Sequence, residues 1–109
     1  MNYIHGKEIV EKWRLMPLAD QMGNIGSEVS RARKWENKDE KIFLNTIWRA
    51  LELLDLTISD KRWHSSLKEI TRTKEVLCDI VFGEKQYQTT LADLDRYFTQ
   101  YALAARRNI

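Results

Sequence analysis

The stretch 17-PLADQMGNIGSEVSRARKW-35 decides the fold, because its apolar residues recur at the spacing of an α-helix. Five of them step by four and three positions: Leu18, Met22, Ile25, Val29 and Ala32. This spacing places them on one face of a helix. The stretch therefore predicts an amphipathic helix over 17–35 that packs against other helices.

Two glycines, Gly23 and Gly26, lie inside this helical pattern. Each costs roughly 1 kcal/mol relative to alanine in a helix interior. Two such costs within one turn indicate that the backbone lies close to another element there. We therefore expect Gly23 and Gly26 to be helix-packing residues.

The same periodicity continues along the rest of the chain, with helices expected over about 40–58, 61–82 and 90–107. Residues 1–16 form either a short N-terminal helix or an extended arm. Short connections make consecutive helices antiparallel neighbours. The predicted fold is all-α, an up-and-down antiparallel helical bundle of three long helices plus that short N-terminal helix or arm. The whole chain, 1–109, is expected to form one domain.

Capping residues mark where these helices begin and end. Asp39 can cap the helix that follows the break at ENKD, and Ser59 or Asp60 can cap the helix over 61–82. Thr90 and Asp93 have the spacing of a capping box. Gly83 is expected to stop the helix before it in a left-handed conformation, which glycine adopts at little cost.

The composition favours a water-soluble helical domain. The chain is 43% hydrophobic and 31% charged, and its net charge is only +2. Cys78 is the single cysteine, so no disulfide forms within the chain. The first residues carry charges and lack the apolar core of a signal peptide. No apolar stretch approaches the roughly 20 residues needed to span a membrane. We expect a cytoplasmic protein with no membrane contact.

Catalytic and metal-binding motifs are not visible in the chain. A di-metal bundle needs Glu-x-x-His pairs, but the residues three positions before His5 and His64 are Asn2 and Lys61. Cys78 lies in an apolar helical pattern and is best interpreted as a small core residue. The prediction is therefore a protein that is not an enzyme, with no catalytic residue, metal or cofactor.

A basic cluster with a tryptophan is the one pattern that points to a ligand. Basic residues interleaved with an aromatic ring can hold phosphates and stack on bases. Nearby acidic residues dilute this charge, so the alternative is an ordinary surface on which the tryptophan covers the core. The candidate nucleic-acid-binding residues are Arg31, Arg33, Lys34, Trp35, Lys38 and Lys41.

The order of motifs resembles a family of small four-helix bundle proteins. The segment Gln21-Met22-Gly23-Asn24-Ile25-Gly26-Ser27-Glu28, followed by Arg31 and Arg33, is similar to the Ile-Pro-x-Asn-Ile-Ala-Glu-Gly motif and basic segment of that family. Its members are encoded in intervening sequences of bacterial large-subunit ribosomal RNA genes. Accessory variability determinant proteins of diversity-generating retroelements are their relatives. The resemblance implies a homo-oligomer, often a five-membered ring. For the retroelement branch it also implies a reverse transcriptase and RNA as partners.

The number of aromatic residues also predicts self-association. Four tryptophans and four tyrosines exceed what one thin core readily covers. We expect a non-enzymatic, self-associating binding protein that contacts RNA or DNA as an accessory factor to a reverse transcriptase-type partner. The alternative is a protein-only adaptor or scaffold that binds no nucleic acid.

Overall fold

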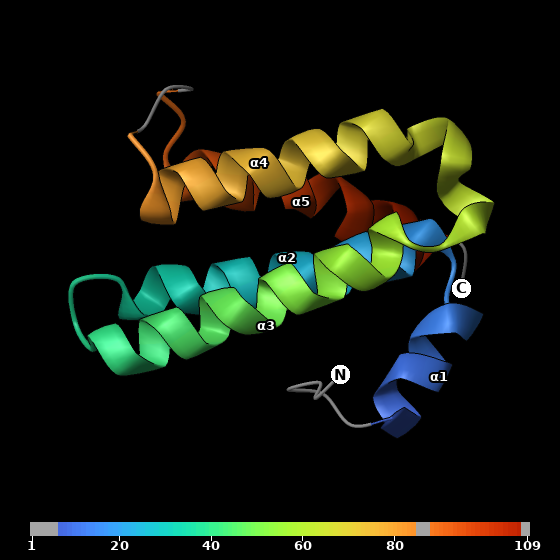
Figure 1. Ribbon diagram of the computed structural model, residues 1–109, viewed down its shortest axis with the longest axis horizontal. Helices are drawn as coiled ribbons and strands as arrows, with labels where there is room; N and C mark the ends of the chain where they lie inside the picture. The colour runs from blue at the N-terminus through green and yellow to red at the C-terminus, as the bar shows by residue number, and fades with distance from the viewer. Residues whose placement is uncertain (1–6, 85–87, 108–109) are drawn as a thin grey trace.

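Five α-helices and one 3-10 helix make up the described chain (Figure 1). The structure is a computed structural model that describes residues 7–84 and 88–107. In chain order the elements are α1 (Lys7–Leu15), α2 (Leu18–Trp35), α3 (Glu40–Ile58), η1 (Lys61–Ser66), α4 (Leu67–Phe82) and α5 (Leu91–Arg107). The fold is all-α, as predicted. Each of the four predicted ranges contains one long α-helix, so the predicted count of three long helices is one short.

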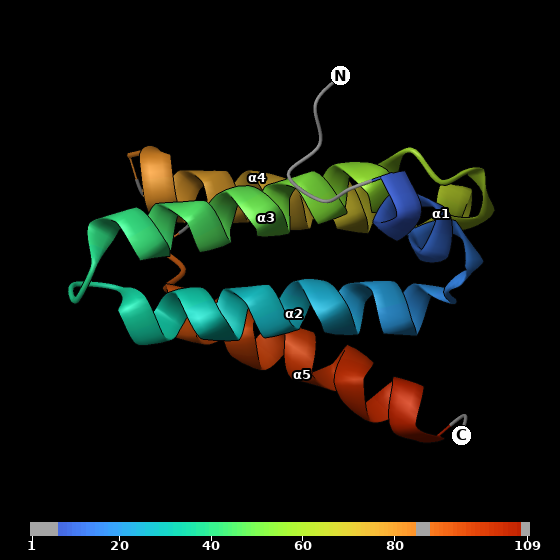
Figure 2. The same cartoon turned by 90° about the horizontal axis from the view of Figure 1, so that it is seen from below.

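The four long helices form a bundle in which successive helices run antiparallel. In Figure 1, α3 and α4 lie on the side nearest the viewer, with α2 and α5 behind them. Figure 2 shows α5 lying along α2 and α4 lying along α3. The most extensive helix contacts are those of α2 with α3 and with α5. Helix α2, which the stretch 17–35 forms, is therefore the central helix of the bundle.

The core confirms that the periodic residues of α2 face inward. Met22, Ile25, Val29 and Ala32 are completely buried. The other helices contribute Trp13, Ile47, Ala50, Leu51, Leu53, Leu54, Ile70, Leu77, Leu91, Leu94 and Phe98. Burial of this apolar face is the main favourable contribution to folding, because it removes hydrocarbon surface from water.

Of the two forms predicted for residues 1–16, a short helix or an extended arm, the described part of the segment adopts the helix, α1 (Lys7–Leu15). The Trp13 ring is buried, and its Nε1 donates to Thr57 Oγ1 at 3.1 Å. Gln21 Nε2 donates to the carbonyl oxygen of Trp13 at 2.8 Å. These contacts join α1 to both α2 and α3. Residues 1–6 lie outside the described part of the chain.

The predicted helix over 61–82 is wrong in one respect, because it is divided into η1 and α4. Trp63 has φ −102° and ψ 24°, outside the helical region. Its Nε1 donates to Gln21 Oε1 at 3.0 Å. This bond joins the kink to a residue 42 positions away in the chain, on α2. The tertiary hydrogen bond thus accompanies the kink.

The helix ends agree with the sequence in most places. The Asp39 carboxylate accepts from the amide of Ile42, and Asp60 accepts from the amide of Arg62. Thr90 and Asp93 form the reciprocal capping box, with bonds of 3.0 and 3.1 Å. The left-handed conformation expected at Gly83 is wrong. Its φ is −98° and its backbone is extended, while its amide bonds to the carbonyl of Asp79.

Candidate functional site

The basic cluster lies at the corner where α2 ends and α3 begins. The turn between them passes through Asn37, whose φ of 66° is left-handed. Asparagine is among the few residues that adopt this conformation readily. This turn, which the sequence predicted only as a break, brings the cations at the end of α2 near those at the start of α3.

Two of the predicted cations are already paired within the chain. Arg31 Nη1 lies 3.2 Å from Glu28 Oε1, and Arg33 Nη1 lies 3.1 Å from Asp95 Oδ2 on α5. Lys34, Lys38 and Lys41 are exposed, and Trp35 is 37% exposed. The corner therefore presents three lysines, one partly open indole ring and two arginines that pair with carboxylates while 53% and 48% of their side chains stay exposed.

A hollow of about 450 Å³ lies at this corner, against the C-terminal part of α4. Its charged lining residues are Lys38, Glu36 and Glu40, so two carboxylates oppose one ammonium group. Phosphate oxygens are repelled by carboxylates at short range. This hollow is consequently a poor place for a nucleic-acid backbone, and any such contact would use the outer lysines instead.

A second surface, which we call the α3–α4 outer face, has a different character. Trp48 on α3 and Phe82 at the end of α4 lie with ring centroids 5.4 Å apart and ring planes at 32°. Both side chains are 50% exposed. Lys74 Nζ lies 2.5 Å from Asp55 Oδ1 farther along the same two helices. The α3–α4 outer face thus combines an open aromatic pair with an ion pair.

Sequence reasoning did not identify Trp48 or Phe82. A signal for Trp48 exists, because the outward stripe of α3 is otherwise polar or charged at Lys41, Asn45, Glu52 and Asp55. A tryptophan in such a stripe is a large apolar residue on the solvent side of a helix. Phe82 has no comparable local signal, since its aromatic neighbour lies on another helix.

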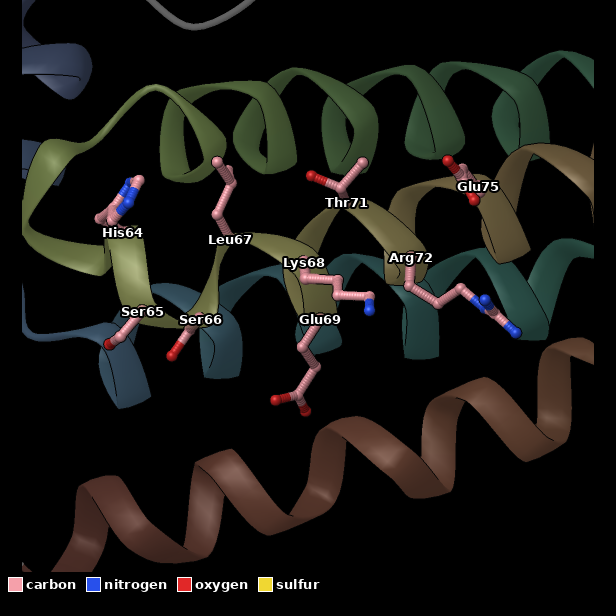
Figure 3. A pocket seen from close by; sticks show the side chains of 9 residues that line it. All are labelled: His64, Ser65, Ser66, Leu67, Lys68, Glu69, Thr71, Arg72 and Glu75. Atoms are coloured by element: carbon pink, nitrogen blue, oxygen red, sulfur yellow. The ribbon is translucent and has the colours of Figure 1, made fainter.

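Another hollow, of about 900 Å³, lies along η1 and the first half of α4. Figure 3 shows Glu69 pointing toward α5, with Leu67 and Thr71 pointing toward α3. Glu69 Oε1 accepts from Tyr97 at 2.7 Å and from Tyr101 at 3.1 Å. The lining mixes cations and carboxylates from Lys68, Arg72, Glu69 and Glu75. The hollow therefore favours neither an anionic nor a cationic ligand.

The titration of these groups gives no sign of an activated nucleophile. Burial raises the pKa of Tyr97 and Tyr101, with the neighbouring hydroxyl and Glu69 adding to the rise at Tyr101. Burial also raises the pKa of the Cys78 thiol. A nucleophilic cysteine needs the opposite shift, because the thiolate is the reactive form. These hydroxyl and thiol groups remain protonated at neutral pH.

The strongly lowered pKa of Asp60 belongs to a structural cluster. Hydrogen bonds from Arg62 lower the pKa of Asp60 to about 2 against the opposing effect of burial. Arg62 also donates to the carbonyl oxygen of Met16 at 3.0 Å and lies 4.5 Å from the centre of the Trp63 ring. Asp60 and Arg62 therefore fix the kink between α3 and α4 against the end of α1.

Metal and membrane sites have no candidates in residues 7–84 and 88–107. No group of three or more histidine, cysteine, aspartate or glutamate side chains is suitably arranged for a metal ion there. No helix in the same residues is long and apolar enough to cross a membrane. No family model matches the chain, and comparisons with curated proteins and with solved structures also find no match.

Proposed function

We propose that this protein is a non-enzymatic helical-bundle binding protein that self-associates through the α3–α4 outer face. The observation that carries the proposal is the half-exposed pair of Trp48 and Phe82. Aromatic residues are enriched at the centres of protein interfaces, where burial of one ring can contribute much of the binding energy. Self-association is also what the resemblance to the ribosomal RNA intervening-sequence proteins implies.

The test is the mass in solution of the unmodified protein and of Trp48→Lys. The proposal predicts a mass above the 13.0 kDa of one chain for the unmodified protein at micromolar concentration. Lysine at position 48 should shift the equilibrium to the single chain, because it places a hydrated charge in the contact. Leu103→Lys is the matched control, since Leu103 is 47% exposed but lies on α5. A mass of 13.0 kDa for the unmodified protein across micromolar concentrations would contradict the proposal.

Between the two partner classes, the geometry supports a protein partner more strongly than a nucleic acid. The α3–α4 outer face offers apolar area, whereas carboxylates partly offset the charge of Arg31 and Arg33 at the basic corner. The protein-only adaptor is therefore the favoured form of the proposal. The reverse transcriptase-type partner named by the resemblance would be one such protein.

Nucleic-acid binding remains a second candidate because Lys34, Lys38 and Lys41 are exposed beside Trp35. It predicts that RNA or DNA is retained at low salt and released steeply as salt is added. Changing Lys34 and Lys38 together to glutamine should reduce the slope of log affinity against log salt, by roughly 0.7 to 0.9 for each phosphate that the variant no longer neutralises. Lys68→Gln, on α4, is the control. Failure of the unmodified protein to retain any RNA or DNA at low salt would remove this candidate.

A further inference from the structure

The outward stripe of α3 is arranged symmetrically about Trp48. Lys41 lies seven residues before Trp48, and Asp55 lies seven residues after it. Seven residues are almost two full helical turns, so the three side chains leave the helix in nearly the same direction. Each step is roughly 10 Å along the axis. A cation and an anion therefore lie at equal distances on either side of an exposed indole ring.

We infer that a second copy of this chain covers the α3–α4 outer face, with the two α3 helices antiparallel about a two-fold axis at Trp48. In this arrangement Lys41 of each copy lies opposite Asp55 of the other. The inference rests on the proposed self-association and adds its symmetry and register, with a two-fold dimer in place of the five-membered ring that the resemblance implies. A two-fold interface requires that if one residue contacts another, the reverse contact also occurs. The equal spacing of Lys41 and Asp55 about Trp48 satisfies this requirement.

The charges at the ends of the stripe are available for such a contact. Lys41 is exposed and forms no ion pair with the residues that the structure describes. Asp55 accepts from Lys74 through Oδ1, yet its side chain is still 58% exposed. The carboxylate therefore has room for a second cation from another copy. Lys41, Asp55 and Lys74 would then form an alternating series of charges across the contact.

The same charges disfavour the other simple register. If the two α3 helices ran parallel about a two-fold axis, Lys41 would face Lys41 and Asp55 would face Asp55. Like charges at short range oppose association, and such repulsion is a common source of specificity. The antiparallel arrangement places the two Trp48 rings at the centre, each flanked by Phe82 from its own chain. The aromatic centre supplies affinity and the outer charges select the orientation.

The register can be tested with two charge reversals, Lys41→Glu and Asp55→Lys, studied alone and as an equimolar mixture. Each variant alone would place like charges together at both ends of the contact. We expect the dissociation constant of its dimer to be at least about tenfold higher than that of the unmodified dimer. A dimer of one Lys41→Glu chain with one Asp55→Lys chain has opposite charges at both ends. We therefore expect the mixture to recover the dimer.

The mass of each sample by sedimentation equilibrium, with helicity checked by circular dichroism, separates the outcomes. Lys38→Glu, in the turn before α3, is the control for a change in net charge alone and should leave the dimer intact. Recovery in the mixture supports the two-fold register. Unchanged dimers for both single variants, no recovery in the mixture, or an unmodified assembly larger than a dimer would overturn the register while self-association stands. A single-chain mass for the unmodified protein would overturn both.

Discussion

The contact between α2 and α5 and the α3–α4 outer face use side-chain bulk in opposite ways. At the first, Gly26 is buried, and a Cβ added there would lie 2.5 Å from Phe98 Cβ. At the second, Trp48 and Phe82 contact each other but leave half of each side chain in solvent. The α2–α5 contact is therefore closed within one chain. The outer face retains apolar surface of the kind that a second molecule covers in a protein interface.

The largest effect is expected from Gly26→Leu. The new side chain would overlap Phe98, and overpacking of a tight core contact typically costs about 1–3 kcal/mol. Denaturant unfolding followed by circular dichroism measures the change. An unchanged or increased free energy of unfolding would show that α2 and α5 do not approach closely at this position.

A smaller and opposite effect is expected from Gly23→Ala. An added Cβ would lie 3.6 Å from Ala102 Cα and 3.7 Å from its nitrogen, which is ordinary van der Waals contact. Alanine is favoured over glycine in a helix interior by up to about 1 kcal/mol. The variant should therefore be more stable than the unmodified protein, as shown by a raised midpoint of unfolding.

Gly26→Ala is the matched comparison for Gly23→Ala, because both substitutions raise the intrinsic helix propensity by the same amount. Its Cβ would meet the Cβ of Phe98, which is fixed to the backbone of α5 and cannot move aside as a side-chain tip can. We expect this variant to be destabilised. Equal stabilisation by the two alanines would contradict the prediction that the helices approach more closely at Gly26 than at Gly23.

The smallest effect on folding is expected from Lys41→Glu, on the other surface. Lys41 is exposed and has no ion pair among the described residues. Surface changes of this kind usually alter stability by less than about 0.5 kcal/mol. The free energy of unfolding, measured in dilute solution where single chains dominate, should stay within that range. A larger loss would mean that this charge supports the fold itself rather than assembly.

The parts of the fold that depend on local patterns were predictable from the sequence. The spacing of Met22, Ile25 and Val29 predicted the inward face of α2, since a helix brings residues three and four apart together. The caps at Asp39 and Thr90 were predictable for the same reason, because a capping side chain bonds within its own turn. Each of these signals lies within one or two turns of helix.

The parts that were missed depend on residues distant in the chain. The kink at Trp63 accompanies a hydrogen bond to Gln21, and the pairing of Arg33 depends on Asp95. Neither partner can be assigned before the packing of the helices is known. The same limit applies to the candidate site, where Trp48 needs Phe82 from another helix to form the aromatic pair. Local periodicity predicts which residues lie on one face but not what lies opposite them.

The most direct test of the account is hydroxyl-radical footprinting of the unmodified protein over a range of concentrations, with oxidation measured residue by residue. The account predicts that oxidation of Trp48 and Phe82 falls as concentration rises, because a second copy covers them. Leu15 and Leu103, which are exposed on α1 and α5, should be oxidised equally throughout. Oxidation of Trp48 and Phe82 that does not change with concentration, or protection at Leu103 instead, would contradict it.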